Sequence, residues 1–336
     1  MAQITDKSPL VDQLGRTHHS LRISVTDRCN IRCFYCMPNE NVQFKPRNEI
    51  LSFEEIVRFV RVVSQMGVRR LRLTGGEPLV RSDVPQLVEQ LAALPLVDDL
   101  ALTTNGILLA EQADALRRAG LRRVNISLDT ISEEVFEKIT RREGLDRVLA
   151  GIEAAIRVGF QSIRLNAIAI RGLTENEILP LARFARERGL ELRFIEYMPL
   201  DAEKHWQAGD VLDGDTIRRI VEAEFGRLLP VDPPHPSQPA VDFEYADGRG
   251  RIGLIHPVSR PFCESCDRLR LTAEGQVRNC LFSSVEWDAR ALLRGGGTDD
   301  EIARLVRDCV WAKATAHGIG SDEFVRPERA MYQIGG

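Results

Sequence analysis

The chain has 336 residues, of which 43% are hydrophobic and 28% are charged. These fractions are ordinary for a globular protein, and the length suffices for one large domain or two smaller ones. The net charge of −4 argues against a general nucleic-acid binder, which is usually basic. No apolar run approaches the ~20 residues that a membrane span needs, and no signal segment is visible in residues 1–20. We therefore expect a cytoplasmic protein without a membrane or nucleic-acid partner.

A cysteine motif follows the first predicted strand. An extended arm over residues 1–20 leads into this strand at 21–25, and then come Cys29, Cys33 and Cys36 at C-x3-C-x2-C spacing. Three close thiolates on one loop can hold three corners of a cubane iron–sulfur cluster and leave the fourth iron open. The alternatives are a zinc loop or core cysteines. Zinc spacings are usually C-x2-C or C-x4-C in pairs, and a structural zinc site has a fourth ligand, so the spacing favours the cluster.

Up to residue 197, six short apolar strands alternate with amphipathic helices in a repeating β-α pattern. The predicted strands cover residues 21–25, 70–73, 100–103, 124–128, 162–170 and 192–197. The predicted helices cover 52–66, a stretch from 84, 109–119, 132–140, 146–158 and 174–188. Ser52 with Glu55 forms a capping box at the first helix. Such repeats predict parallel strands joined by right-handed crossovers, in a barrel or a doubly wound sheet.

The positions of the candidate site residues decide between these two folds. They follow the carboxyl ends of several different strands, for example Cys29, Gly76, Asn105, Asp129 and Met198. A barrel brings all these ends to one mouth, whereas an open sheet uses only its switch point. We therefore expect residues 1–200 to form a complete or partial (β/α) barrel.

The pattern changes from about residue 201. A helical stretch at 215–225 and a proline-rich link at 230–236 precede short β-like runs at 240–245 and 250–255, and further helices are predicted over 285–293 and 299–314. This segment is too irregular to continue the barrel. We expect residues 201–336 to be a C-terminal extension that covers the open side of the barrel.

The extension carries a second cysteine motif, C-x2-C-x13-C, formed by Cys263, Cys266 and Cys280. Its spacing fits zinc, with His256 as the nearest fourth ligand, as well as it fits a cluster. The first motif, which also lacks a fourth ligand, favours the cluster. The seventh cysteine, Cys309, lies in a helical pattern and is expected to be a small buried residue.

Two arginines stand between these cysteines. In an extended run, Arg268 and Arg270 point to the same face. Two adjacent guanidiniums fit a phosphate or a purine oxygen, and the alternative is a solvated charged edge. Their position beside a metal centre with an open coordination site favours ligand binding.

The segment Cys29–Cys36, with residues 21–26 before it, resembles the signature of the radical S-adenosylmethionine (SAM) enzymes. The resemblance implies an incomplete six-stranded (β/α)6 TIM-like barrel. It implies a [4Fe–4S] cluster on Cys29, Cys33 and Cys36, whose open iron binds SAM so that its cleavage yields a 5′-deoxyadenosyl radical. It also implies SAM contacts from Tyr35, Gly76, Ser127 and Met198.

The second motif, C-x2-C-D-R-x-R-x9-C, is similar to one branch of that family, which acts on GTP in molybdenum cofactor biosynthesis. The resemblance covers nearly the whole chain, including the final Gln333–Gly336, whose double glycine is expected to reach the active site. It implies a second [4Fe–4S] cluster on Cys263, Cys266 and Cys280. GTP contacts are implied for Arg22, Arg72, Thr103, Arg164, Arg268, Leu269 and Arg270, with Arg70 and Arg193 as further triphosphate candidates. Arg268 and Arg270 are counted as catalytic with the first three cysteines.

Arg164 differs from the branch, which usually has lysine at this position. The positive charge is kept, but a planar guanidinium that can donate two hydrogen bonds replaces a compact ammonium. The implied partners are GTP, a downstream cyclic pyranopterin monophosphate synthase and an external electron donor, and a homodimer is compatible with the resemblance. Two other readings stay open: a radical enzyme that modifies peptides, and a zinc-binding regulatory module without catalysis. The central expectation is that both metal centres face one positively charged chamber at the barrel mouth.

Overall fold

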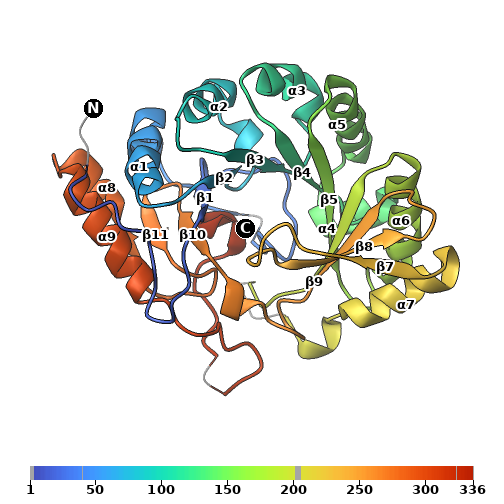
Figure 1. The fold of residues 1–336 in the computed structure, drawn as a ribbon. Helices are drawn as coiled ribbons and strands as arrows, with labels where there is room; N and C mark the ends of the chain where they lie inside the picture. The colour runs from blue at the N-terminus through green and yellow to red at the C-terminus, as the bar shows by residue number, and fades with distance from the viewer. Residues whose placement is uncertain (1–3, 40, 201–205, 323, 336) are drawn as a thin grey trace.

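A curved sheet of twelve strands forms the frame of the molecule (Figure 1). The computed structural model describes residues 4–39, 41–200, 206–322 and 324–335. Six parallel strands follow one another in chain order: β1 (Ser20–Ser24), β2 (Arg70–Thr74), β3 (Asp99–Thr104), β4 (Arg123–Ser127), β5 (Ser162–Ala169) and β6 (Glu191–Glu196). The six predicted strands and the partial barrel are therefore confirmed.

Helices cover the outer face of this barrel, as Figure 1 shows. They are α1 (Phe53–Gln65), α2 (Val84–Ala92), α3 (Leu109–Arg118), α5 (Leu145–Val158) and α6 (Ile178–Glu187). In contrast, α4 (Glu133–Thr140) contacts the loop after β1, where the Arg32 and Phe34 N–H groups donate to the Thr140 and Ile139 carbonyls. The predicted capping box at α1 is present: the Glu55 backbone N–H donates to the Ser52 hydroxyl, and the Ser52 N–H donates to the Glu55 carboxylate. Satisfying these amides fixes where α1 begins.

The strands are amphipathic in a way that makes the barrel interior polar. Leu71 and Leu73 of β2 belong to the hydrophobic core between sheet and helices, whereas Arg70 and Arg72 alternate with them and stay half-buried. β1 repeats the pattern, with Leu21 and Ile23 in the core. Since side chains of a strand alternate between faces, the polar set of each strand points into the barrel.

The C-terminal segment extends this sheet at both ends. It contains α7 (Gly214–Phe225), β7 (Leu228–Val231), β8 (Ala240–Tyr245), β9 (Arg251–Ile255), β10 (Arg268–Leu271), β11 (Gln276–Arg278), β12 (Trp287–Asp288), α8 (Ala289–Arg294), α9 (Asp299–Trp311) and α10 (Met331–Ile334). β9 pairs in parallel with β6, and β10 pairs in parallel with β1. The predicted C-terminal extension is therefore confirmed, and it adds strands to both edges of the barrel sheet, which its irregular sequence pattern did not predict.

One predicted helix is shorter than expected. The stretch 285–293 was predicted to be helical, but Trp287 and Asp288 pair with Val277 and Gln276 as β12, and α8 begins only at Ala289. Strand pairing with β11 overrides the local helical pattern there. No helix in the described ranges is long and apolar enough to span a membrane.

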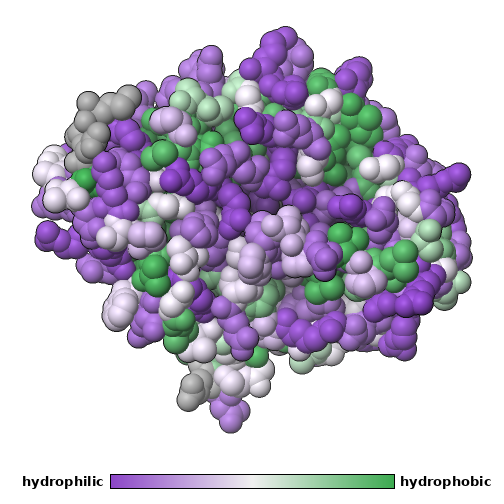
Figure 2. All heavy atoms as spheres, in the orientation of Figure 1, coloured by the Kyte–Doolittle hydropathy of each residue, from purple (hydrophilic) through white to green (hydrophobic). Residues whose placement is uncertain are grey.

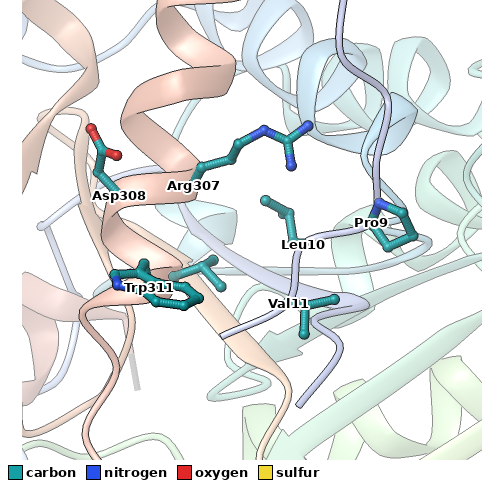
Figure 3. Close-up of a pocket in the computed structure, with 7 residues that line it drawn as sticks. Pro9, Leu10, Val11, Arg307, Asp308 and Trp311 are labelled. Atoms are coloured by element: carbon teal, nitrogen blue, oxygen red, sulfur yellow. The ribbon is translucent and has the colours of Figure 1, made fainter. Parts of the chain in front are cut away.

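The N-terminal arm packs against α9 on the outside of the barrel. A pocket of about 260 Å³ lies between them and is lined by Pro9, Leu10, Val11, Arg307, Asp308, Val310 and Trp311. Figure 3 shows Arg307 reaching from α9 toward the arm, with Trp311 beside Val11. Hydrophilic side chains cover most of the face seen in Figure 2, including its middle, and hydrophobic ones form smaller patches. The pocket contains none of the predicted site residues.

The arm is held by a buried histidine, from which we predict acid sensitivity. His18 is 0% exposed; its Nε2 lies 3.2 Å from Asp12 Oδ2, and its Nδ1 is buried without a partner. Burial, reinforced by the Lys313 ammonium, lowers the pKa of His18 to about 4. Above pH 6.5 the ring is neutral in both states. Below it, only the unfolded chain gains the proton, so the unfolding free energy should fall by about 3 kcal/mol as the pH drops through the folded pKa.

Urea unfolding at about pH 7.5 and about pH 5 measures the larger part of this loss, about 2 kcal/mol. His18→Gln keeps a donor for Asp12 and removes the titrating ring, so it should lose clearly less stability on acidification than the wild type. An equal loss in both proteins would show that other groups cause the acid sensitivity.

Candidate functional site

The first cysteine group lies in the loop that follows β1. The Met37 backbone N–H and the Cys36 backbone N–H both donate to the Cys33 carbonyl, at 2.8 and 3.0 Å, and close the loop into a tight turn. Burial, with the Glu77 carboxylate next, raises the pKa of Cys29 to about 11. Burial also raises the pKa of Cys33, and Asp129, Cys36 and Cys29 add to the rise. All three cysteines thus lie on one closed, partly buried loop.

Two buried carboxylates flank this group. Glu77 accepts from the Asn105 N–H at 2.6 Å, the Leu79 N–H at 3.0 Å and the Thr104 hydroxyl at 2.8 Å, yet burial raises its pKa to about 7. Asp129 accepts from the Tyr35 hydroxyl at 2.6 Å, and burial raises its pKa to about 6. A cationic group bound beside either carboxylate would favour its ionised form.

The residues predicted to contact SAM gather at this end of the barrel. A small cavity is lined by Ile31, Cys33, Tyr35, Asn105, Ser127, Asp129, Thr130, Phe136, Ile139 and Thr140. Gly76 follows β2, and its N–H donates to the Thr26 carbonyl at 2.8 Å. Met198 is half-buried just after β6. Tyr35, Gly76, Ser127 and Met198 thus lie at the carboxyl ends of the strands, where the cysteine loop also lies.

Gly76 is required by close packing against that loop. A Cβ on it would lie 2.7 Å from the Arg28 carbonyl carbon and 2.8 Å from the Asp27 carbonyl oxygen, which are backbone atoms directly before Cys29. Gly76→Ala should therefore displace the loop, cost about 1–3 kcal/mol and lower the iron content. Gly209→Ala is the matched control, since nothing lies within 4 Å of its Cβ. Equal iron content and melting temperature in the two variants would refute this role.

The second cysteine group lies at the opposite end of the strands. Cys266 stands two residues before β10, which runs parallel to β1, whereas Cys29 stands after β1. Cys280 follows β11, which is antiparallel to β10, and so returns to the same end as Cys266. The expectation that both centres lie at one barrel mouth was wrong. The interior of the barrel separates them, because β10 joins β1 in parallel.

Cationic and backbone donors surround the second group. Lys313 Nζ lies 3.6 Å from Cys266 Sγ, and the Phe282 N–H donates to Cys280 Sγ at 3.5 Å. Burial alone would raise the pKa of Cys266, but Lys313 and Arg268 together hold it below its usual value. His256 does not approach as a fourth ligand: its Nδ1 lies 3.3 Å from Glu196 Oε1, and its Nε2 lies 3.3 Å from Arg260 Nη2.

Between the two groups, three arginines lie side by side across neighbouring strands. Arg22 of β1 is in register with Arg270 of β10 on one side and Arg72 of β2 on the other. Within the described residues, no hydrogen bond or ion pair reaches the guanidinium of Arg22 or Arg72. Burial, then the neighbouring guanidiniums, lowers the pKa of Arg22 well below its usual value and that of Arg72 to about 9. An anionic ligand would relieve this repulsion.

Arg268 and Thr103, which are also predicted to contact GTP, each have a buried polar atom without a hydrogen-bond partner. Arg268 stacks on Phe262, with its guanidinium carbon 4.8 Å from the ring centre, and its Nη2 is buried and unpartnered. The Thr103 hydroxyl is also buried without a partner. Leu269 differs, because it packs in the hydrophobic core on the face of β10 opposite Arg268 and Arg270. Its side chain does not enter the barrel interior.

The other arginines are already paired with carboxylates. Arg164 Nε donates to Glu191 at 2.7 Å, and Arg193 Nε donates to the same carboxylate at 2.5 Å. Arg70 donates to Asp267 at 2.5 Å and to the Ser237 hydroxyl at 3.1 Å. A phosphate at these positions would share the guanidiniums with the carboxylates.

The C-terminal tail reaches into the barrel. The Gly335 carbonyl accepts from Arg270 Nη1, and a Cβ on Gly335 would overlap Ser24 Oγ and lie 3.2 Å from Thr74. The φ of +73° at Gly335 favours glycine as well. The structure thus brings Gly335 to Arg270, Ser24 and Thr74. The approach of the double glycine to the active site stays a prediction, and Gly336 lies outside the described residues.

Sequence reasoning missed several residues of this interior. Ser237 and His235 come from the proline-rich link between β7 and β8, which extends toward the middle of the barrel in Figure 1. Lys313 comes from the end of α9, far from the cysteines in sequence. Only Glu77 had a local signal, because it follows the two glycines after β2.

The donor sets fit iron–sulfur clusters. Each group supplies three free, half-buried thiols, which is the set that holds three corners of a cubane. Within the described ranges, no three or more histidine, cysteine, aspartate or glutamate side chains surround a single ion position. A cubane distributes its cysteine ligands over separate irons, so it does not need such a position.

Comparison with known families divides the chain into two matched regions. Residues 23–185 match the radical SAM superfamily, and residues 190–319 match the family described as Molybdenum Cofactor Synthesis C. A GTP 3′,8-cyclase from Rhodopirellula baltica is 53% identical over 99% of this chain and 94% of its own length. Another from Corynebacterium glutamicum is 43% identical over 97% and 89%.

Solved structures share the fold at low sequence identity. SuiB from Streptococcus suis bound to SAM has a TM-score of 0.60 at 16% identity and covers 87% of this chain and 68% of its own. The enzyme anSMEcpe with bound SAM has a TM-score of 0.60 at 14% identity over 92% and 93%. These neighbours support the partial barrel with its C-terminal extension.

Proposed function

The chain belongs to the GTP 3′,8-cyclase family of the radical SAM superfamily, and from this premise we propose that it converts GTP to (8S)-3′,8-cyclo-7,8-dihydroguanosine 5′-triphosphate. This is the first step of molybdenum cofactor biosynthesis. One observation carries the proposal: two three-cysteine groups lie at opposite ends of one barrel, and between them Arg22 and Arg72 have no carboxylate partner among the described residues.

At the carboxyl ends of the strands, Cys29, Cys33 and Cys36 hold the first [4Fe–4S] cluster in our proposal. Gly76, Tyr35, Ser127 and Met198 bind SAM beside it. Buried Glu77 supports this assignment, since a carboxylate with a pKa raised to about 7 by burial suits a cationic amino group. When bound, the cluster and SAM supply the one-electron chemistry that removes hydrogen from ribose C3′.

At the other end, Cys263, Cys266 and Cys280 would hold the second cluster, which could bind a guanine nitrogen or oxygen because the protein supplies only three thiolates. Arg22, Arg72, Arg268, Arg270 and Thr103 bind GTP, since each presents a polar group to the barrel interior. Arg70, Arg164 and Arg193 bind the triphosphate while paired to carboxylates. The Arg164 guanidinium can donate to Glu191 from one edge and to a phosphate from the other. A lysine ammonium at this position would carry the same charge but would not fix the direction of the hydrogen bonds.

The protein's part in catalysis is to position and enclose GTP. The protein binds GTP at both its guanine and its triphosphate, and this fixes the ribose between them. C3′ then faces the SAM end of the barrel, and C8 lies within reach of C3′. Gly335 and the surrounding tail occupy the interior near Ser24 and restrict water access. The C3′–H bond breaks and its hydrogen leaves with 5′-deoxyadenosine. The C3′–C8 bond forms, and N7 takes up one electron from the external donor and one proton, so the product is an isomer of GTP.

Two regions of the chain have different roles in the proposed reaction. Residues 1–200 form the radical SAM barrel, and residues 201–336 supply the second cluster and much of the substrate site; residues 201–205 at this boundary lie outside the described residues. We also propose a cytoplasmic location, an external electron donor, a homodimer, and a cyclic pyranopterin monophosphate synthase that consumes the product.

The test is anaerobic turnover of GTP with SAM and a strong reductant. Because the product has the mass of GTP, chromatography must separate the two before mass spectrometry. GTP deuterated at C3′ should transfer its deuterium to 5′-deoxyadenosine. About eight iron atoms per chain should accompany activity. Zinc in place of iron, or SAM cleavage without any change in GTP, would refute the proposed function.

A further inference from the structure

Lys313 is a buried ammonium beside the second cysteine group. It is 3% exposed and follows the carboxyl end of α9. Its Nζ lies 3.6 Å from Cys266 Sγ and donates to the Arg268 carbonyl at 3.0 Å. It therefore contacts both a cysteine of the second group and the backbone of β10.

No carboxylate of the described residues lies within 4.0 Å of this ammonium. A buried charge without a counter-charge costs several kcal/mol, and proteins normally pair it. Among the described residues, the Cys266 sulfur is the contacting group that would carry negative charge as a cluster ligand. The negative charge of the sulfur ligands is therefore the natural counter-charge for Lys313.

Neighbouring contacts fix the segment that carries Lys313. Arg16 Nη1 donates to the Cys263 carbonyl at 2.8 Å, and Arg16 Nη2 donates to the Ala314 carbonyl at 2.9 Å. The His317 N–H also donates to Cys263. Arg16 thus ties the cysteine group to the chain directly after Lys313, so the ammonium has little freedom to move away.

The first cysteine group has the opposite electrostatic setting. Its buried neighbours are the carboxylates Glu77 and Asp129. The Arg32 guanidinium donates to the Cys29 carbonyl at 2.6 Å, and the side-chain donor to the Cys29 sulfur is the neutral amide of Asn105, at 3.8 Å. The reduction potential of an iron–sulfur cluster depends on nearby charge and on hydrogen bonds to its sulfurs. A cation beside a sulfur ligand stabilises the more negative, reduced state.

We propose that Lys313 is a positioning residue that raises the reduction potential of the second cluster through its contact with Cys266. The inference rests on the proposed assignment of Cys263, Cys266 and Cys280 to that cluster. It concerns this end of the barrel alone, so the first cluster serves as an internal reference.

The test is an anaerobic redox titration of both clusters followed by electron paramagnetic resonance. Lys313→Met removes the charge at similar length, and Lys313→Arg retains it. Lys138→Met on the exposed side of α4 is the control for loss of a surface lysine. We expect a lower midpoint potential of the second cluster in Lys313→Met, a smaller shift in Lys313→Arg, and no shift of the first cluster.

An unchanged second-cluster potential in Lys313→Met would overturn the inference, and so would equal shifts of both clusters. If Lys313→Met loses the second cluster, Lys313→Arg decides: retention supports the charge, whereas loss in both variants assigns Lys313 to packing. A wild-type protein without a second cluster would instead refute the proposed function.

Discussion

Cys266→Ala is expected to abolish GTP cyclisation while SAM is still cleaved, whereas Cys29→Ala abolishes both. The two residues lie at opposite ends of the paired strands β1 and β10, so removing one sulfur leaves the other centre's surroundings in place. Without the second centre GTP loses a fixed position, and cyclisation should fall by at least about 10³-fold. Cyclised product and 5′-deoxyadenosine, quantified in the same anaerobic reaction, measure the two activities separately.

Cys309→Ala is the matched control, because Cys309 is buried in the core and belongs to neither group. It should retain both activities and lose only about 1 kcal/mol of stability. If Cys266→Ala lost SAM cleavage as completely as Cys29→Ala, the two groups would not have separate roles.

Local sequence patterns were sufficient to predict the barrel and the character of its interior. Strand β2 shows why: Leu71 and Leu73 alternate with Arg70 and Arg72, so the period of two specifies which face carries charge. The same alternation correctly predicted that Arg268 and Arg270 share a face, because their segment is extended as β10. Both inferences depend only on residues that are neighbours in the sequence.

Long-range pairing could not be predicted in this way. Nothing local to Arg268–Leu271 indicates that this strand joins β1 in parallel, and this pairing is what places Cys266 at the far end of the barrel. Arg70 pairs with Asp267, 197 residues away. Lys313 meets Cys266 across 47 residues. Such contacts are set by how elements assemble, and a one-residue change of register would alter every one of them.

Arg22→Met is expected to stabilise the ligand-free protein and to remove GTP turnover. Burial, with Arg270, Arg268 and Arg72 adding to it, lowers the pKa of Arg22 well below its usual value. The arginine is nevertheless charged in the unfolded chain at neutral pH, so folding has to bury a repelled charge. Removing that charge should raise the unfolding free energy by about 1–2 kcal/mol. Substitutions that stabilise a protein by this amount often do so at the expense of function. GTP should then lose its stabilising effect on the melting temperature.

The matched control is Arg58→Met. Arg58 lies outside the barrel interior, where its Nε donates to Asp299 at 2.9 Å and its Nη2 donates to the Gly297 carbonyl at 2.6 Å. Removing this arginine leaves buried Asp299 unpaired, so the melting temperature should fall while GTP turnover persists. Melting curves with and without GTP separate the two cases. Without GTP, Arg22→Met should raise the melting temperature, whereas Arg58→Met should lower it. A lower melting temperature for ligand-free Arg22→Met would mean that Arg22 supports the fold, and that relief of repulsion by an anion is not why GTP binds there.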